Sequence, residues 1–211
     1  MANTNAPRGL IPYRRASGEP YNSPGNVYWV NGSYATALYV GDPVQIIAGA
    51  SDGNGIPSIQ LVTPGNGTDT GISTYGLIGS IAGVIPGGSP QVPVLQSQPV
   101  YVPASVGGNG TYVLVSDDPD ALFVVQANTD WSTGTYTPGS VLGPGKNVDL
   151  VSGTGSTVTG YSGWVLGATL STTALQMKVL RLLMQSDNAL GIYSKWLCRI
   201  NLNQLNNTTG T

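Results

Sequence analysis

Histidine is absent from this 211-residue chain, and cysteine occurs once, at Cys198. The missing histidine removes the commonest general base and the commonest ligand for zinc or iron. A single cysteine cannot form an intramolecular disulfide or a thiolate cluster within one chain. We therefore expect no enzyme activity, no cofactor and no metal. Cys198 is interpreted as a buried structural thiol in a protein made in a reducing compartment.

Charged residues are also scarce, at 9% of the chain where about a quarter is usual. The formal net charge of −2 leaves no basic field able to neutralise many phosphates, so we expect no nucleic-acid partner. The sequence has no run of about 18 apolar residues that could span a bilayer, and its N-terminus lacks the layout of a signal peptide. We therefore expect no membrane association.

The residues that are abundant indicate a rigid β-protein rich in turns. The chain contains 30 Gly and 15 Pro, yet 40% of its residues are apolar. From Val27 onward, short apolar runs alternate with turn signals, and there is no fixed-period repeat. This pattern predicts an all-β fold, either a single β-sandwich of jelly-roll type or a β-barrel. The predicted β-rich body spans 27–205, with a Gly/Ser/Thr-rich loop at 128–163 and a flexible tail at 206–211.

Turn residues predict how several strands are connected. Asn-Gly tolerates the positive φ angles of a tight hairpin turn, and Gly-rich runs force similar reversals. Further strands are expected at 75–85, where glycines indicate a bent, close-packed strand, and at 121–127. Two predicted hairpins join 27–30 to 36–40 through Asn31-Gly32 and 98–104 to 111–116 through residues 107–110, and residues 52–55 predict a further chain reversal between 42–48 and 57–63.

Residues 172–185 fit either a helix or a strand. No Gly or Pro interrupts them, and Leu175, Val179 and Leu182 have helical spacing. The following segment, 192–203, alternates between two faces as a strand does. A hairpin through the turn at 187–191 uses both segments consistently, so the strand interpretation is favoured.

Two segments have residues that could bind a calcium ion or a phosphate group. The carboxylates of Asp117, Asp118 and Asp120 could hold a calcium ion, but Asp residues around a proline are equally typical of a β-turn, which we favour. The segment GTGSTVTG at 153–160 resembles a phosphate-binding loop only superficially, because it lacks the Gly-Lys-[Ser/Thr] ending.

The N-terminal segment, residues 1–26, is predicted to be an extended arm. It has no apolar period, and it contains three of the eight basic residues. Arginine forks, tyrosine rings and stiff prolines suit an arm that lies along an acidic or polar groove of a neighbouring protein. We expect deletion of the arm to leave a folded body that binds its partner more weakly. The candidate partner-binding residues are Arg8, Tyr13, Arg14, Arg15, Pro20 and Tyr21.

Four stretches together carry a resemblance to a known family. They are APRGLIPYRRASGEPYN (6–22), YVPASVGGNGTYVLVSDDPDALFVVQ (101–126), GKNVDLVSGTGSTVTGYSGWVL (145–166) and LRLLMQSDNALGIYSKWLCRINLNQL (180–205). The combination resembles the capsid decoration, or cement, proteins of tailed bacteriophages. The resemblance covers most of the chain, from Ala6 to about Leu205.

This resemblance implies a β-rich protein on the outer surface of the virion, made in the cytoplasm of the host bacterium. It would bind a major capsid protein of HK97-like fold, and it would associate with itself as a homo-dimer or homo-trimer at local symmetry axes. The implied function is to bridge neighbouring capsid subunits and stabilise the shell. Two alternatives are weighed: another virion component, such as a tail, neck or head-fibre protein, and a carbohydrate-binding β-sandwich whose Tyr and Trp rings stack on sugars.

Overall fold

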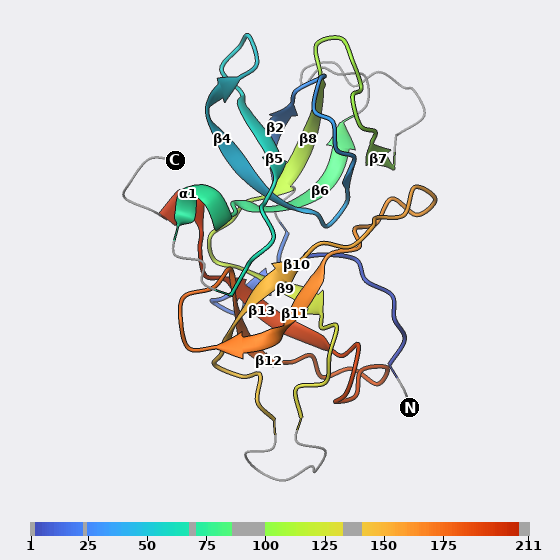
Figure 1. Cartoon of the computed structure of the whole chain (residues 1–211), viewed down its shortest axis with the longest axis vertical. Helices are drawn as coiled ribbons and strands as arrows, with labels where there is room; N and C mark the ends of the chain where they lie inside the picture. The colour runs from blue at the N-terminus through green and yellow to red at the C-terminus, as the bar shows by residue number, and fades with distance from the viewer. Residues whose placement is uncertain (1–2, 23–24, 68–70, 86–99, 133–140, 207–211) are drawn as a thin grey trace.

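The computed structural model describes residues 3–22, 25–67, 71–85, 100–132 and 141–206. A closed five-stranded barrel lies above an open six-stranded sheet in the view of Figure 1. The predicted all-β class is confirmed, because strands dominate the described residues and helix is confined there to two short segments. The body has two hydrophobic cores, one for each of these β-units.

The barrel is a ring of five strands in the order β2-β5-β4-β6-β8. Neighbouring strands are antiparallel except for β2 and β5, which are parallel. A closed ring leaves no strand with unpaired backbone groups along its side. The bounds are Asn26–Val30 (β2), Pro43–Ser51 (β4), Pro57–Leu61 (β5), Gly79–Ile85 (β6) and Thr111–Ser116 (β8).

The six-stranded sheet is open and antiparallel throughout, in the order β1-β9-β13-β12-β10-β11. Strands β1 and β11 are therefore its two edges. The bounds are Ile11–Arg15 (β1), Ala121–Gln126 (β9), Asn147–Val151 (β10), Val165–Ser171 (β11), Met177–Leu182 (β12) and Lys195–Ile200 (β13).

Four short elements complete the described fold. Strands β3 (Leu38–Tyr39) and β7 (Tyr101–Val102) pair with each other, and the rings of Tyr39 and Tyr101 stack with centroids 5.2 Å apart. The helix α1 (Ile72–Tyr75) and the 3-10 helix η2 (Gln204–Asn206) lie between the barrel and the sheet at one side of the molecule (Figure 1).

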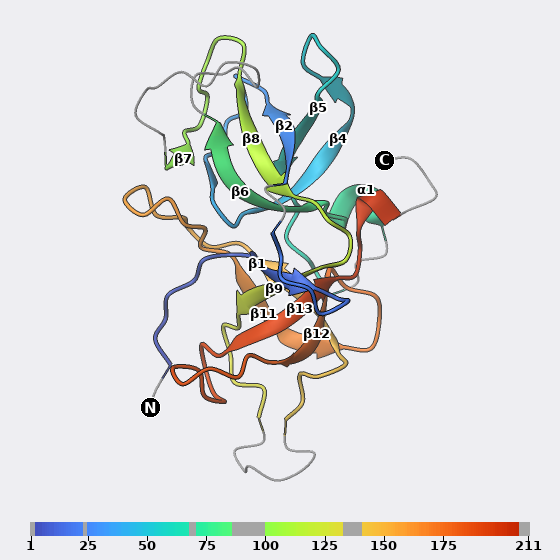
Figure 2. The same cartoon turned by 180° about the vertical axis from the view of Figure 1, so that it is seen from behind.

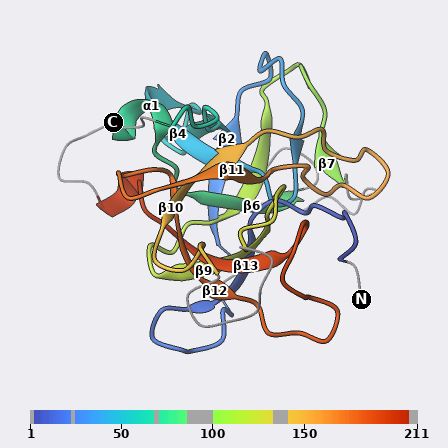
Figure 3. The same ribbon diagram turned by 60° about the horizontal axis from the view of Figure 1, so that its bottom comes forward.

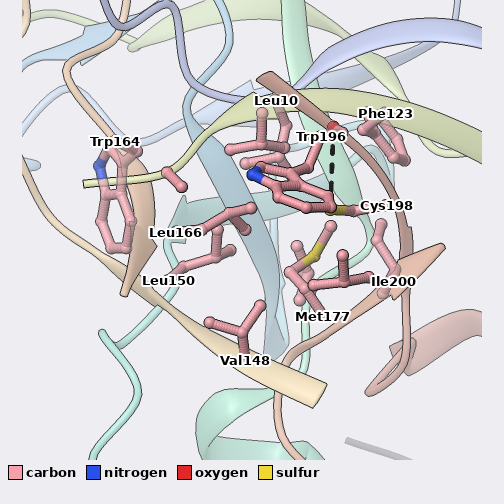
Figure 4. Packing of buried hydrophobic residues seen from close by; sticks show 14 of the residues in the cluster. Leu10, Phe123, Val148, Leu150, Trp164, Leu166, Met177, Trp196, Cys198 and Ile200 are labelled. Carbon is pink, nitrogen blue, oxygen red and sulfur yellow. Dashed lines mark hydrogen bonds between the residues drawn. The ribbon is translucent and has the colours of Figure 1, made fainter. Parts of the chain in front are cut away.

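The core of the sheet is the more aromatic of the two. Trp131 and Trp196 are buried with ring centroids 5.3 Å apart, and Phe123, Met177 and Cys198 pack around them (Figure 4). The barrel core consists mainly of Val, Ile and Leu side chains, which suit a pleated, half-buried surface.

Buried polar groups join the barrel to the sheet. Gln176, at the start of β12, is fully buried, and its Nε2 donates to the carbonyls of Thr63 and Tyr75 at 2.9 and 3.0 Å. Its Oε1 accepts from the Leu150 N–H of β10 at 3.0 Å. From η2, Gln204 Oε1 accepts from the Ile46 N–H of β4 at 2.8 Å. Because buried polar groups are costly when unpaired, these bonds hold the two β-units together.

The favoured strand interpretation of residues 172–185 is confirmed. Strand β12 pairs with β13 as the predicted hairpin, with Met177 opposite Ile200 and Leu182 opposite Trp196. A bulge between Val179 and Arg181 changes the alternation, so that Leu182, opposite Trp196, packs against the sheet core in place of Arg181. Ile192 is half exposed, because it lies in the connection that precedes β13.

The predicted reversal between 42–48 and 57–63 is confirmed, and it joins β4 and β5 as a hairpin with the Asp52 carboxylate accepting the N–H groups of Asn54 and Ile56 in the turn. The two hairpins predicted around Asn31-Gly32 and residues 107–110 are wrong. Strand β2 pairs with β8 and β5, while β3 pairs with β7. The Asn-Gly and Gly-rich turns reverse the chain, but the strands that flank them find partners far away in the sequence.

Two predicted segments contain more structure than the sequence indicated. The loop expected at 128–163 includes β10, and Trp131 is buried while Tyr161 is 39% exposed. Residues 133–140, including Tyr136, lie outside the described residues. The N-terminal segment is extended as expected, but it is integrated into the fold. Its strand β1 pairs with β9, and Leu10 is fully buried in the sheet core.

Candidate docking surface

The six candidate partner-binding residues lie along the β1 edge of the sheet and the segments that flank it. Tyr13 is 45% exposed, and Pro20 is exposed beside Arg14, with which it forms an isolated bridge. Arg14 and Tyr21 are partly buried, and Tyr21 packs against the sheet core. A ring in that position stabilises the fold rather than presenting itself to a partner.

A groove of about 600 Å³ runs beside β1. One wall is the N-terminal segment, which contributes Arg8, Ile11 and Tyr13, and the floor includes Val124 of β9. The opposite wall is the connection between β12 and β13, which contributes Leu183 and Lys195 among others. Figure 3 shows the N-terminal segment alongside this connection. The groove therefore combines apolar surface with the cation of Arg8 and with the ion pair of Lys195 and Asp187 at 2.9 Å.

Amide side chains fix the N-terminal segment in place. Asn3 Nδ2 donates to the carbonyls of Ala189 and Ile192, and Asn3 Oδ1 accepts from the Ala189 N–H at 2.9 Å. Gln126 of β9, which is 5% exposed, accepts from the Ala6 N–H and donates to Asn5 Oδ1 at 2.8 Å. The segment is thus ordered before any partner binds, which lowers the entropic cost of docking.

The three arginines of the segment have different surroundings. The Arg8 guanidinium lies 4.8 Å from the centre of the Tyr161 ring, a cation–π contact. Arg15 forms an ion pair with Asp118 at 2.8 Å and lies 4.0 Å from Glu19. Arg14 has no ion pair within the described parts of the chain. Arg15 is therefore engaged within the protein, whereas no carboxylate of the described residues pairs with Arg14.

The outer face of the sheet carries a row of cations that sequence reasoning missed. Figure 2 shows β1, β9, β13 and β12 on the side turned toward the viewer. The register places Arg14, Leu122, Arg199 and Lys178 opposite one another across these four strands. The next row along consists of Ile11, Val124, Leu197 and Arg181.

The sequence feature that could have revealed this cationic face is the set of basic residues at 178, 181, 195 and 199 in the predicted hairpin. Residues 16–145 contain no Lys or Arg, so every basic side chain belongs to the sheet or its flanking segments. The pairing of β1 with β9 adds Arg14 to the group, and no local pattern predicts that pairing.

The Asp117–Asp120 segment serves the fold, as the favoured turn interpretation proposed. Asp117 is buried and accepts from Tyr28 Oη at 2.7 Å and from Asn26 Nδ2 at 2.9 and 3.0 Å. Burial, reinforced by the bond to Asp117, raises the pKa of Tyr28. Asp118 pairs with Arg15, and Asp120 pairs with Arg199 at 3.1 Å. Within the described residues, no group of three or more His, Cys, Asp or Glu side chains could hold a metal ion.

Two further titratable groups are buried. Cys198 is fully buried, and burial raises the pKa of its thiol, so the predicted structural role fits its place in the core. Asp42 is 2% exposed, where the barrel meets the loop around Ser162. Burial raises the pKa of Asp42 to about 6, against the opposing effect of hydrogen bonds from Ser162 and the Tyr39 N–H.

Comparisons with known proteins give no relative: no family model, no curated protein and no solved structure matches the chain. Among the described residues, no helix is both long and apolar enough to cross a membrane.

Proposed function

We propose that this chain is a non-enzymatic docking protein that binds the outer surface of a tailed-phage head. In this role it bridges neighbouring copies of a major capsid protein and cements the shell. The observation that carries the docking proposal is the groove beside β1, where Ile11 and Tyr13 are exposed on an edge strand next to Arg8 and Lys195. The choice of a capsid as the partner rests on the resemblance of the four sequence stretches.

The surface chemistry supports a protein partner with an acidic or polar groove. Ile11 and Val124 supply apolar surface, Leu197 is buried beside Val124, and Arg14 and Arg181 lie next to these residues without ion pairs among the described residues. Edge strands bind extended segments through the backbone, and neighbouring pockets supply specificity. A protein that binds the assembled lattice better than free subunits stabilises the lattice by mass action.

The experiment that tests this function is binding to purified phage heads that lack the chain. We expect the wild-type protein to co-sediment with heads to saturation, and cryo-electron microscopy of the complex to show it on the outer surface. The number of copies per particle distinguishes a cement protein from a tail or neck component. Hundreds of copies indicate a cement protein, and tens or fewer indicate a tail or neck component. Absence of the chain from the head surface would contradict the proposal.

Two matched variants test the surface itself. Ile11→Ser changes a side chain that is 36% exposed beside the groove, and Val106→Ser changes one that is 37% exposed on the barrel. We expect the first to weaken binding to heads at least tenfold and the second to leave it unchanged. Equal effects of the two variants would exclude the β1 edge as the docking surface. Light scattering of the free protein would show whether it is the proposed dimer or trimer.

A further inference from the structure

A second pocket, of about 330 Å³, lies where β12 and β13 approach α1 and η2. Its wall contains Lys178, Arg199 and three asparagines, together with the apolar side chains of Ile72 and Ile200. No carboxylate contributes to this wall as far as the described residues extend. The side chains around the pocket are therefore cations, amides and hydrocarbon, a composition that favours a negatively charged occupant.

One amide in the wall has a buried donor without a partner. Asn203 is 5% exposed, and its Oδ1 accepts from the N–H groups of Leu205 at 2.8 Å and Asn206 at 3.3 Å. These two bonds fix the orientation of the amide, so the remaining atom is the Nδ2 donor. Within the described residues, Nδ2 has no hydrogen-bond partner. A buried donor normally finds an acceptor, and here no acceptor of the described residues forms a hydrogen bond with it.

The two cations of the pocket repel each other. Lys178 and Arg199 are directly opposite on adjacent antiparallel strands, an arrangement that destabilises a sheet when the charges are alike. Arg199 forms an ion pair with Asp120, which does not line the pocket. Within the described residues, Lys178 has no ion pair. An anion between the two side chains would remove this repulsion.

We propose that this pocket binds one oxyanion, a carboxylate or a phosphate group. Such a group offers the acceptor oxygens that the Asn203 amide lacks, and its charge complements Lys178 and the unpaired side of the Arg199 fork. The site is separate from the groove beside β1, because the two share no lining residue. The inference does not depend on the proposed capsid partner.

The test is an NMR titration of the full chain, following the Asn203 side-chain amide and the Arg199 Nε–H. Inorganic phosphate represents a free anion, and the peptide acetyl-Gly-Glu-Gly-amide represents an acidic side chain. Sodium chloride at equal ionic strength is the reference. We expect saturable shifts of both probes with phosphate, with the peptide or with both, and the tighter ligand identifies the source of the oxyanion. Shifts that do not saturate, or that chloride reproduces, would overturn the proposal.

Two variants make the test specific. Asn203→Asp keeps the Oδ1 acceptor for Leu205 and Asn206 but replaces the donor with a carboxylate, so we expect affinity to fall at least tenfold. Lys178→Gln should weaken binding about as much, whereas the matched change Lys146→Gln, at a lysine outside the pocket, should not. Arg199 Nε–H remains the probe in all three variants. Unchanged affinity in a folded Asn203→Asp protein would show that the pocket is not the site.

Discussion

The barrel and the six-stranded sheet solve the problem of strand edges in different ways. The barrel closes on itself, so each of its five strands has a neighbour on both sides. The sheet stays open, and its edge strand β1 runs beside a groove with exposed apolar side chains. A closed ring suits a rigid body, whereas an open edge offers backbone and side chains to another protein.

The two regions also differ in charge and in core composition. All basic residues lie outside the barrel, since none occurs between residues 16 and 145. Three tryptophans belong to the core of the sheet, whereas the barrel core contains none. The sheet thus combines the more aromatic core with the charged outer surface. This division is why the docking surface is proposed on the sheet and its arm and not on the barrel.

The largest expected effect comes from emptying the sheet core. Trp196 is 1% exposed, and its Nε1 donates to Ser194 Oγ at 2.8 Å. Trp196→Ala should lower the free energy of unfolding by about 3–5 kcal/mol, because it leaves a cavity and an unpaired hydroxyl. Ile59→Ala in the barrel should cost about 2–5 kcal/mol. Urea unfolding followed by circular dichroism measures both.

Both variants should move one common transition, because buried hydrogen bonds join the β-units. Two separate transitions, with Trp196→Ala shifting only one of them, would show that the barrel and the sheet unfold independently.

Gln176 is the next most sensitive position, because it connects the two regions directly. Gln176→Leu would leave the Leu150 N–H and the carbonyls of Thr63 and Tyr75 without their partner. We expect a loss of about 2–4 kcal/mol in the free energy of unfolding, since buried unpaired polar groups cost roughly 1–3 kcal/mol each and partial relaxation offsets some of that. Gln185→Leu, at an exposed glutamine, is the control and should change stability by less than about 0.5 kcal/mol.

Asp42 makes stability depend on pH at the junction of the regions. Its folded pKa of about 6 exceeds the ordinary value of 3.8, so the folded state holds the proton more tightly. Its contribution is fully present below pH 3.8 and is lost as pH rises through 6, a difference on the order of 3 kcal/mol. Asp42→Asn should abolish this dependence and raise stability at pH 8. Urea unfolding midpoints of the wild type and of Asp42→Asn, measured at pH 4.5 and pH 8, check this prediction. The same change of midpoint with pH in both proteins would contradict the assignment to Asp42.

The sequence predicted the local elements better than their partners. Alternation and turn residues located β4, β5, β6, β9 and the β12–β13 hairpin, because those signals lie within each segment. The pairing of β2 with β8 depends on which hydrophobic faces meet across more than 80 residues, and an Asn-Gly turn carries no information about that.

The candidate docking residues illustrate the same limit. A segment with prolines and no apolar period predicts an exposed arm, and Tyr13 is exposed as that pattern suggests. The pattern does not reveal that Leu10 enters the sheet core or that Tyr21 packs against it. Deletion of residues 1–26 would therefore remove part of the core and the β1 strand. Single substitutions on the outer face are the sharper test of binding.

The smallest expected effect separates recognition from stability on the sheet. Lys178→Glu replaces a like-charge pair opposite Arg199 with an opposite-charge pair, which should stabilise the sheet by about 0.2–1 kcal/mol. Added salt should reduce the gain, because both side chains reach solvent. The barrel of this protein offers no equivalent position, because it contains no basic residue whose charge could be reversed. If the stabilised variant also loses oxyanion binding in the pocket beside α1, then the cation pair is retained for recognition at the expense of stability. A variant that gains stability and still binds phosphate or the acidic peptide normally would argue that the pair has no such role.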